Sequence, residues 1–195
     1  MATAQVQSVL PDRIRLPFAF DPAPLVADVA ALERGDFTTH FVQQNFEGDW
    51  SALPLRAAAS ARHPIQMIYS PPDETAFVDT PWRARMPALS AVLRAFRCPV
   101  RSARLMRLAA GSVIKEHRDL DLDVAEGFAR IHVAVVTNAD VDFRLNGTRV
   151  AMAPGEAWYL RLADPHSVVN GGTTPRIHLV MDVVVDDWLL RQLGG

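Results

Sequence analysis

Closely spaced β-strand patterns occupy the second half of the chain, and they constrain the fold more than any other feature. Runs rich in β-branched and aromatic residues alternate with Gly, Pro and Asn, which is typical of sandwiches and barrels. At least seven short strands are expected, within eight segments. The segments are Arg104–Leu108, Ser112–His117, Ile131–Thr137, Val141–Leu145, Thr148–Met152, Glu156–Leu160, His166–Asn170 and Arg176–Val185. Asn146-Gly147 favours a type I′ hairpin turn between the fourth and fifth of them.

The first half of the chain has a different pattern. A helix is expected from about Pro22 to Arg34, with Asp21 as its cap, and another from Thr80–Pro81 to just before Pro99. The second helix has its apolar residues on one face, at Leu89, Val92, Leu93 and Phe96. Residues 1–17 are expected to be extended or loose, and short strands and turns are expected between Gly35 and Pro72.

A polar and aromatic cluster lies inside that middle segment. It consists of His40, Gln43, Gln44, Asn45 and Trp50. A solvated loop and the mouth of a substrate site are both open interpretations of this cluster. The strand pattern with helices outside predicts a mainly β fold, a jelly-roll or barrel. We expect a single domain, 1–195, in which residues 1–100 form a helical and irregular part packed on a strand core at 101–188.

Composition sets limits on partners and location. Of 195 residues, 49% are hydrophobic and 22% are charged, so a globular core is expected. The net charge of -2 disfavours a nucleic-acid or membrane-surface partner. Cys98 is the only cysteine, which fits a reducing compartment, and neither a signal-peptide pattern nor a membrane-spanning apolar stretch is visible. A cytoplasmic location is the expectation.

Three residues in the strand half form a possible metal site. His117 and Asp119 are two residues apart, so on an extended segment they point to one side, and His166 begins a later strand. Two histidines and one carboxylate are the ligands that hold Fe(II) on one face and leave positions open for O2 and a co-substrate. Any one of these histidines, taken singly, is also interpretable as an ordinary hydrogen-bonded residue.

Two pairs of basic residues accompany the triad. Arg130 and His132 share one face of a predicted strand, and Arg176 and His178 share one face of another. Inside a barrel these cations would need an anion or a metal nearby, because burying an unpaired charge is costly. Arg176 would suit a carboxylate such as that of 2-oxoglutarate. The alternative is that these strands turn their polar side to solvent.

Five blocks of this region resemble the aspartyl/asparaginyl β-hydroxylase family. The blocks are Gly111–Asp119, Arg130–His132, Pro154–Tyr159, His166–Asn170 and Arg176–Asp182. The resemblance implies a double-stranded β-helix fold, similar to the cupins, that uses Fe(II) and 2-oxoglutarate. Residues 1–100 match this family only loosely.

The resemblance also implies roles for individual residues. His117 and His166 would ligate iron, and Arg176 would pair with the distal carboxylate of 2-oxoglutarate. Arg130 and His132 would lie near the metal-binding end of that molecule. Asp119 would supply an acidic ligand that some family members lack, and Met106 stands where some members have a serine that holds the distal carboxylate.

We therefore expect a 2-oxoglutarate-dependent dioxygenase that uses Fe(II) and O2 to hydroxylate an amino acid, a peptide or a peptide-like substrate. Two alternatives remain open at this point. One is a cupin-like metal-dependent enzyme that does not use 2-oxoglutarate, for which Arg176 would be incidental. The other is a non-catalytic module that binds a metal or a ligand.

Overall fold

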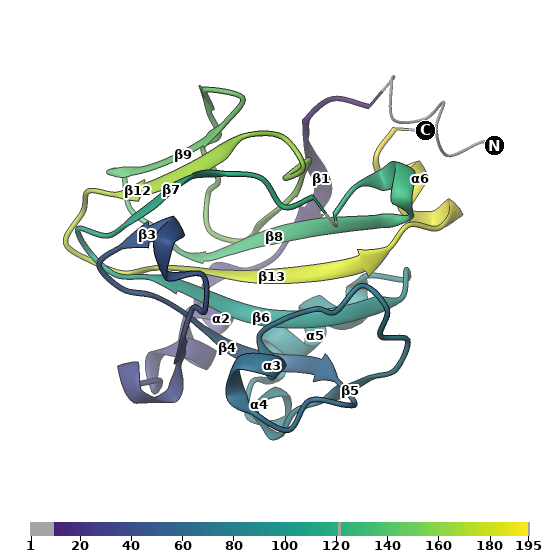
Figure 1. Ribbon diagram of the computed structural model, residues 1–195, viewed down its shortest axis with the longest axis horizontal. Coiled ribbons are helices and arrows are strands. Elements are labelled where there is room, and N and C mark those ends of the chain that lie inside the picture. The colour runs from purple at the N-terminus through teal and green to yellow at the C-terminus, as the bar shows by residue number, and fades with distance from the viewer. Residues whose placement is uncertain (1–9, 121, 195) are drawn as a thin grey trace.

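The computed structural model describes residues 10–120 and 122–194, and two antiparallel sheets dominate it (Figure 1). The larger sheet has the strand order β1-β11-β8-β13-β6-β4-β2, with β5 paired to β4. Its strands are β1 (Arg13–Ala19), β2 (Thr38–Thr39), β4 (Trp50–Ala58), β5 (Phe77–Asp79), β6 (Val100–Leu108), β8 (Phe128–Val136), β11 (Glu156–Leu160) and β13 (Arg176–Val184).

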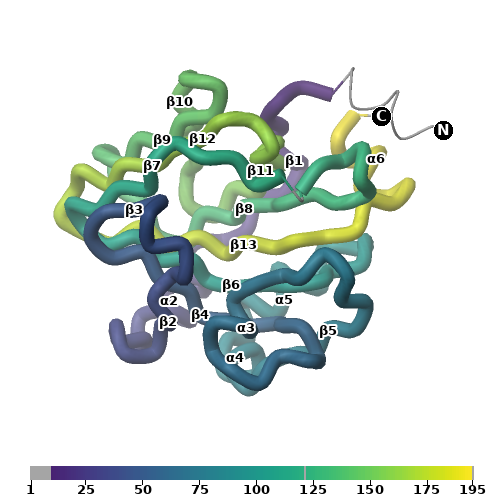
Figure 2. The backbone as a smooth tube through the Cα atoms, in the orientation of Figure 1, coloured from purple at the N-terminus to yellow at the C-terminus, as the bar shows by residue number. Residues whose placement is uncertain are grey.

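The smaller sheet lies over the middle of the larger one, where β7, β9 and β12 run above β8 and β13 (Figure 2). Its order is β10-β9-β12-β7-β3. Its strands are β3 (Phe46–Glu47), β7 (Val113–His117), β9 (Val141–Leu145), β10 (Thr148–Arg149) and β12 (His166–Asn170). The expected mainly β architecture with helices outside is confirmed.

Two apolar clusters stabilise the molecule, one on each face of the larger sheet. They are distinct because successive side chains of a strand point to opposite faces. On β13, Ile177, Leu179 and Met181 face the helices and pack with Leu89 of α5. Val180, between them in the sequence, faces the smaller sheet instead. Polar residues that share the inner face with Val180 are therefore enclosed between the two sheets.

The helices are shorter than expected. They are α2 (Pro22–Ala30), α3 (Pro64–Met67), α4 (Pro81–Ala84), α5 (Pro87–Ala95) and α6 (Asp187–Gln192), with single 3-10 turns at η1 (Arg34–Asp36), η2 (Gln43–Asn45) and η3 (Val124–Glu126). The expected end of the first helix at Arg34 was wrong, although Asp21 caps it as expected by accepting from the Ala23 N–H. None of the helices in the described part of the chain is long and apolar enough to cross a bilayer.

The second expected helix is in fact two helices. Pro87 begins α5, and a proline inside one continuous helix would remove a backbone hydrogen bond and clash with the preceding turn. The predicted apolar stripe is confirmed, since Leu89, Val92 and Leu93 of α5 are buried and Phe96 follows them into the same core. Cys98 is buried as well, and this burial raises the pKa of its thiol to about 12.

Two strands of seven and nine residues form in segments for which the sequence predicted only loose chain or short strands. Arg13–Ala19 forms β1, which pairs with β11 at the edge of the larger sheet. Trp50–Ala58 forms β4, a nine-residue strand whose side chains are nearly all buried. The rest of the segment expected to be loose, residues 1–9, lies outside the described residues.

Candidate metal and co-substrate site

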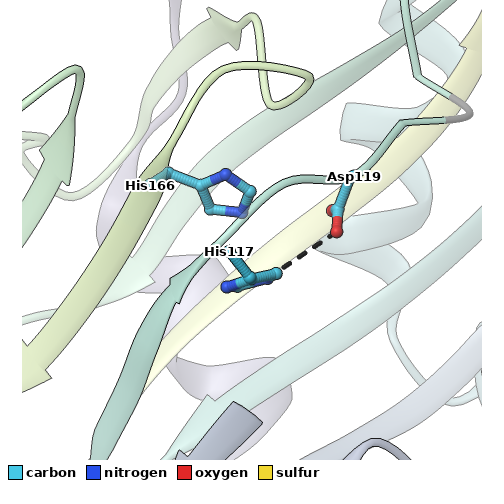
Figure 3. Close-up of side chains that lie close together, drawn as sticks. All are labelled: His117, Asp119 and His166. Carbon is cyan, nitrogen blue, oxygen red and sulfur yellow. Dashed lines mark ion pairs between the residues drawn. The ribbon is translucent and has the colours of Figure 1, made fainter.

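The three predicted metal ligands lie together at the open end of the smaller sheet. His117 ends β7, His166 begins β12, and these two residues are cross-strand partners. Asp119 follows two residues after β7 and turns back toward them (Figure 3). One ligand atom from each residue can be chosen so that all three lie within 4.8 Å of one another.

Backbone carbonyls hold both histidines in the form that a metal needs. The Nδ1 of His117 lies 2.8 Å from the Lys115 carbonyl, and the Nδ1 of His166 lies 3.0 Å from the Asp164 carbonyl. A carbonyl only accepts, so each Nδ1 carries the proton and each Nε2 keeps its lone pair. Burial lowers the pKa of His166 to about 4, which keeps this imidazole neutral at pH 7.

A buried ionic network adjoins the triad. Arg130 pairs with Asp119 and, through Nε at 2.6 Å, with Asp182. Asp182 also accepts from the Ser102 hydroxyl at 3.0 Å and from Arg104 Nη1 at 3.1 Å. Burial alone would raise the pKa of Asp182, but Arg104 and Arg130 hold it well below its usual range. The network therefore keeps this carboxylate charged.

Arg130 and His132 are enclosed between the sheets, so the alternative that they face solvent was wrong. The structure places Arg130 between two carboxylates, Asp119 and Asp182. His132 is buried, and its Nε2 has no hydrogen-bond partner among the described residues. The predicted roles of both residues toward a co-substrate stay predictions.

Arg176 is a buried cation with no anionic partner in the part of the chain that the structure describes. Its guanidinium donates to His178 Nδ1 at 2.8 Å and lies 5.7 Å from the ring centre of Phe143. Its Nε is unpartnered, and no carboxylate in residues 10–120 and 122–194 forms an ion pair with it. Burial lowers the pKa of Arg176 to about 9 for this reason. A negatively charged ligand is what this side chain lacks.

A cavity of about 440 Å³ joins these groups, and Arg176, His132 and the metal triad line one part of it. Met106 lines the same cavity and offers a thioether where a serine would offer a donor. Three members of the polar and aromatic cluster also line it, namely His40, Asn45 and Trp50, whereas Gln43 and Gln44 are not among its lining residues. Phe41 and Tyr69, both partly exposed, line the cavity as well.

His40 contacts two neighbours inside the cavity wall. Its ring stacks on Trp50 with centroids 3.6 Å apart, and its Nδ1 accepts from the Val42 N–H. Burial and the charges of Arg104 and Arg130 lower the pKa of His40 to about 3, so the ring is neutral.

The residues present fit an iron site with a dianionic co-substrate. Two neutral histidines and a carboxylate converge, and unpartnered buried polar atoms of Arg176 and His132 border the same cavity. Fold and site together define a two-sheet β protein in which two histidines and a carboxylate lie close enough to hold a metal ion.

The comparison with protein families identifies the group to which the molecule belongs. Residues 26–185 match the family model described as aspartyl/asparaginyl beta-hydroxylase, and the chain belongs to that family. The L-proline cis-4-hydroxylase of Rhizobium meliloti is 30% identical over 167 residues, which are 84% of this chain and 57% of that protein. The chain thus spans little more than half the length of this curated relative.

Solved structures agree on the fold. An oxidoreductase of the 2OG-Fe(II) oxygenase family from Burkholderia pseudomallei superposes with a TM-score of 0.52 at 18% identity, covering 93% of this chain and 88% of that one. A prolyl-4-hydroxylase from Pseudomonas putida gives a TM-score of 0.51 at 9% identity, covering 95% and 98%. The predicted double-stranded β-helix, or jelly-roll, is confirmed.

Proposed function

We propose that this protein is an Fe(II)- and 2-oxoglutarate-dependent dioxygenase that hydroxylates an amino acid or a small peptide-like substrate. The observation that carries the proposal is one cavity that contains both the His117, Asp119 and His166 triad and the buried, anion-free Arg176. A cupin-like enzyme without 2-oxoglutarate would leave this Arg176 charge uncompensated, so we favour the 2-oxoglutarate-dependent activity.

The triad would hold Fe(II) through the two Nε2 atoms and the Asp119 carboxylate. Asp119 Oδ1 lies 3.6 Å from His117 Nε2 and Oδ2 is engaged by Arg130, so Oδ1 is the oxygen directed toward the histidines. Bound iron and 2-oxoglutarate together supply O2 activation, with 2-oxoglutarate oxidised to succinate and CO2 while a substrate C–H becomes C–OH.

Arg176 would bind the distal carboxylate of 2-oxoglutarate with the donors that have no partner in the structure. A bidentate guanidinium–carboxylate pair would satisfy two donors at once. The carboxylate would also stabilise the positive charge of Arg176, which burial disfavours. His132 lines the same cavity with an unpartnered Nε2 and would lie beside the co-substrate. Phe143 and Val168 give this region apolar walls.

The other part of the cavity would receive the substrate. Arg104 lines it and uses only Nη1 in its hydrogen bonds to Ser102 and Asp182, so its remaining donors suit the carboxylate of an amino acid. The relative named for L-proline hydroxylation makes free proline the first substrate to test. No partner beyond small molecules or peptides is proposed, and the lone buried Cys98 fits the cytoplasmic location that we infer.

Product analysis with isotopically labelled O2 tests this function. The protein, Fe(II) and 2-oxoglutarate are incubated with free amino acids and proline-containing peptides, and the masses of the products are measured by mass spectrometry. We expect one substrate to gain a single labelled oxygen atom, and the gain to disappear without 2-oxoglutarate or in His166→Ala. A product whose oxygen comes from water, or one formed without 2-oxoglutarate, would refute the proposal.

A further inference from the structure

The orientation of Arg176 depends on very few contacts. The residue is 2% exposed, yet among the described residues its guanidinium forms one hydrogen bond to another side chain, the bond to His178. Within residues 10–120 and 122–194 the guanidinium also lies over the ring of Phe143, whose face does not fix rotation about the guanidinium axis. A guanidinium that binds a ligand through two N–H groups must have this rotation fixed. The hydrogen bond to His178 can fix it.

The bond to Arg176 determines the tautomer of His178. A guanidinium has donors and no acceptor, so the Nδ1 of His178 must present its lone pair and its proton must sit on Nε2. The Nδ1 of His132 lies 3.4 Å from the same atom. The Nδ1 of His178 is thus the common neighbour of Arg176 and His132, two of the cavity-lining residues that have unpartnered buried atoms.

The cross-strand partners of His178 offer no substitute for this acceptor. They are Met106 on β6 and Ala134 on β8, and neither side chain has a strong hydrogen-bonding group. His178 itself lines a second cavity, of about 280 Å³, which also contacts Phe143. Part of the His178 ring thus borders this second cavity, and Arg176 is not among the residues that line it.

We propose that His178 is a positioning residue, which orients Arg176 toward the distal carboxylate of 2-oxoglutarate by accepting its Nη2 hydrogen bond. This inference rests on the proposed function, because it presumes that 2-oxoglutarate is the ligand of Arg176. It predicts an effect that is specific for ligands carrying the distal carboxylate, whereas a purely structural role of His178 predicts a general loss.

Two substitutions separate the acceptor from the bulk of the ring. His178→Leu keeps a similar volume and removes the acceptor, and His178→Asn is smaller but can place its Oδ1 near the position of the Nδ1. Calorimetric titration of the Mn(II)-loaded protein measures binding without turnover. The two probes are 2-oxoglutarate and 2-oxopentanoate, which has the same carbon chain without the distal carboxylate.

We expect His178→Leu to weaken 2-oxoglutarate by about tenfold and to leave 2-oxopentanoate within about twofold, since a hydrogen bond to a charged group is lost. His178→Asn should recover most of the affinity, although it leaves more empty space than leucine does. Unchanged 2-oxoglutarate binding in His178→Leu, equal weakening of both probes, or a larger loss in His178→Asn would overturn the inference. If the unsubstituted protein does not bind 2-oxoglutarate, the proposed function fails first, and the role of His178 fails with it.

Discussion

At the residue scale, the site is built from groups whose protonation the surrounding backbone and charges determine. The Lys115 and Asp164 carbonyls fix the tautomers of His117 and His166, and burial keeps the latter neutral. Arg176, by contrast, has no anion beside it among the described residues. Such an arrangement costs stability in the free protein, and a bound carboxylate would compensate for that cost.

Removal of His166 tests the metal site. Unsubstituted protein should bind about one Fe(II) per chain under anaerobic conditions, because three protein ligands with open positions suit this ion. His166→Ala leaves two ligands and should lose this binding in equilibrium dialysis. The control is His63→Ala, because His63 is an exposed residue at the start of α3. Equal iron binding by both variants would show that His166 is not a ligand.

Removal of the Arg176 guanidinium tests whether this residue binds the distal carboxylate of 2-oxoglutarate. Breaking one side of a buried charge pair costs roughly 2–5 kcal/mol. Arg176→Met should therefore weaken 2-oxoglutarate by about 30-fold or more, and Arg176→Lys should recover only part, since a point charge replaces a fork. Titration of Mn(II)-loaded protein measures the effect, with the exposed Arg144→Met as control. An unchanged affinity in Arg176→Met would place the co-substrate elsewhere.

The sequence predicted the ligand triad and Arg176 but not the partners of Arg130. His117 and Asp119 are only two residues apart, so they can be recognised as a pair of candidate ligands within one segment of the sequence. Asp182 meets Arg130 across the β8–β13 ladder and Ser102 across the β6–β13 ladder. Such pairing depends on the register between strands far apart in the chain, which a single sequence does not specify.

At the scale of elements, local signals predicted turns better than helix ends. The Asn146-Gly147 turn forms as expected, with φ of 50° and 72°, although β10 ends at Arg149 rather than at Met152. The strand β4 was missed as a long strand because it is buried on nearly all sides, and such a strand shows no alternation of polar and apolar residues. Its length reflects tertiary pairing with β6.

The hairpin turn provides a stability test at this scale. Gly147 has a φ of 72°, a left-handed conformation that costs a residue with a Cβ about 1–2 kcal/mol. Gly147→Ala should lower the free energy of unfolding by that amount in urea titrations. Gly35→Ala is the matched control, since an added Cβ there meets nothing within 4 Å and its φ is not left-handed. A loss in Gly35→Ala as large as that in Gly147→Ala would contradict the argument from turn geometry.

At the scale of the whole molecule, Asp182 links three central strands of the larger sheet. It bonds Arg130 on β8 and both Ser102 and Arg104 on β6. Replacing this carboxylate leaves Arg104 without its ion pair and Arg130 with Asp119 alone, so Asp182→Asn should destabilise the fold by about 3–5 kcal/mol at pH 7. Urea unfolding measures the difference, and the exposed Asp73→Asn serves as control.

The same network predicts how this difference changes with pH. The pKa of Asp182 is depressed in the folded protein relative to its ordinary 3.8. Its contribution is therefore fully present well above pH 3.8 and is lost progressively as the pH falls below that value. The difference in the free energy of unfolding between the unsubstituted protein and Asp182→Asn should be constant from pH 6 to 8 and smaller at pH 3. A difference that grows in acid would contradict the charge-pair account.

The measurement that most directly tests the central claim is succinate release from 2-oxoglutarate. Purified protein is incubated with 2-oxoglutarate and O2, with and without Fe(II), and succinate is quantified by mass spectrometry in the presence of a candidate amino acid. The account predicts succinate only when Fe(II) is present, and none above background in His166→Ala. Succinate formation that persists without Fe(II) or in His166→Ala would contradict it, as would no succinate from protein that binds both iron and 2-oxoglutarate.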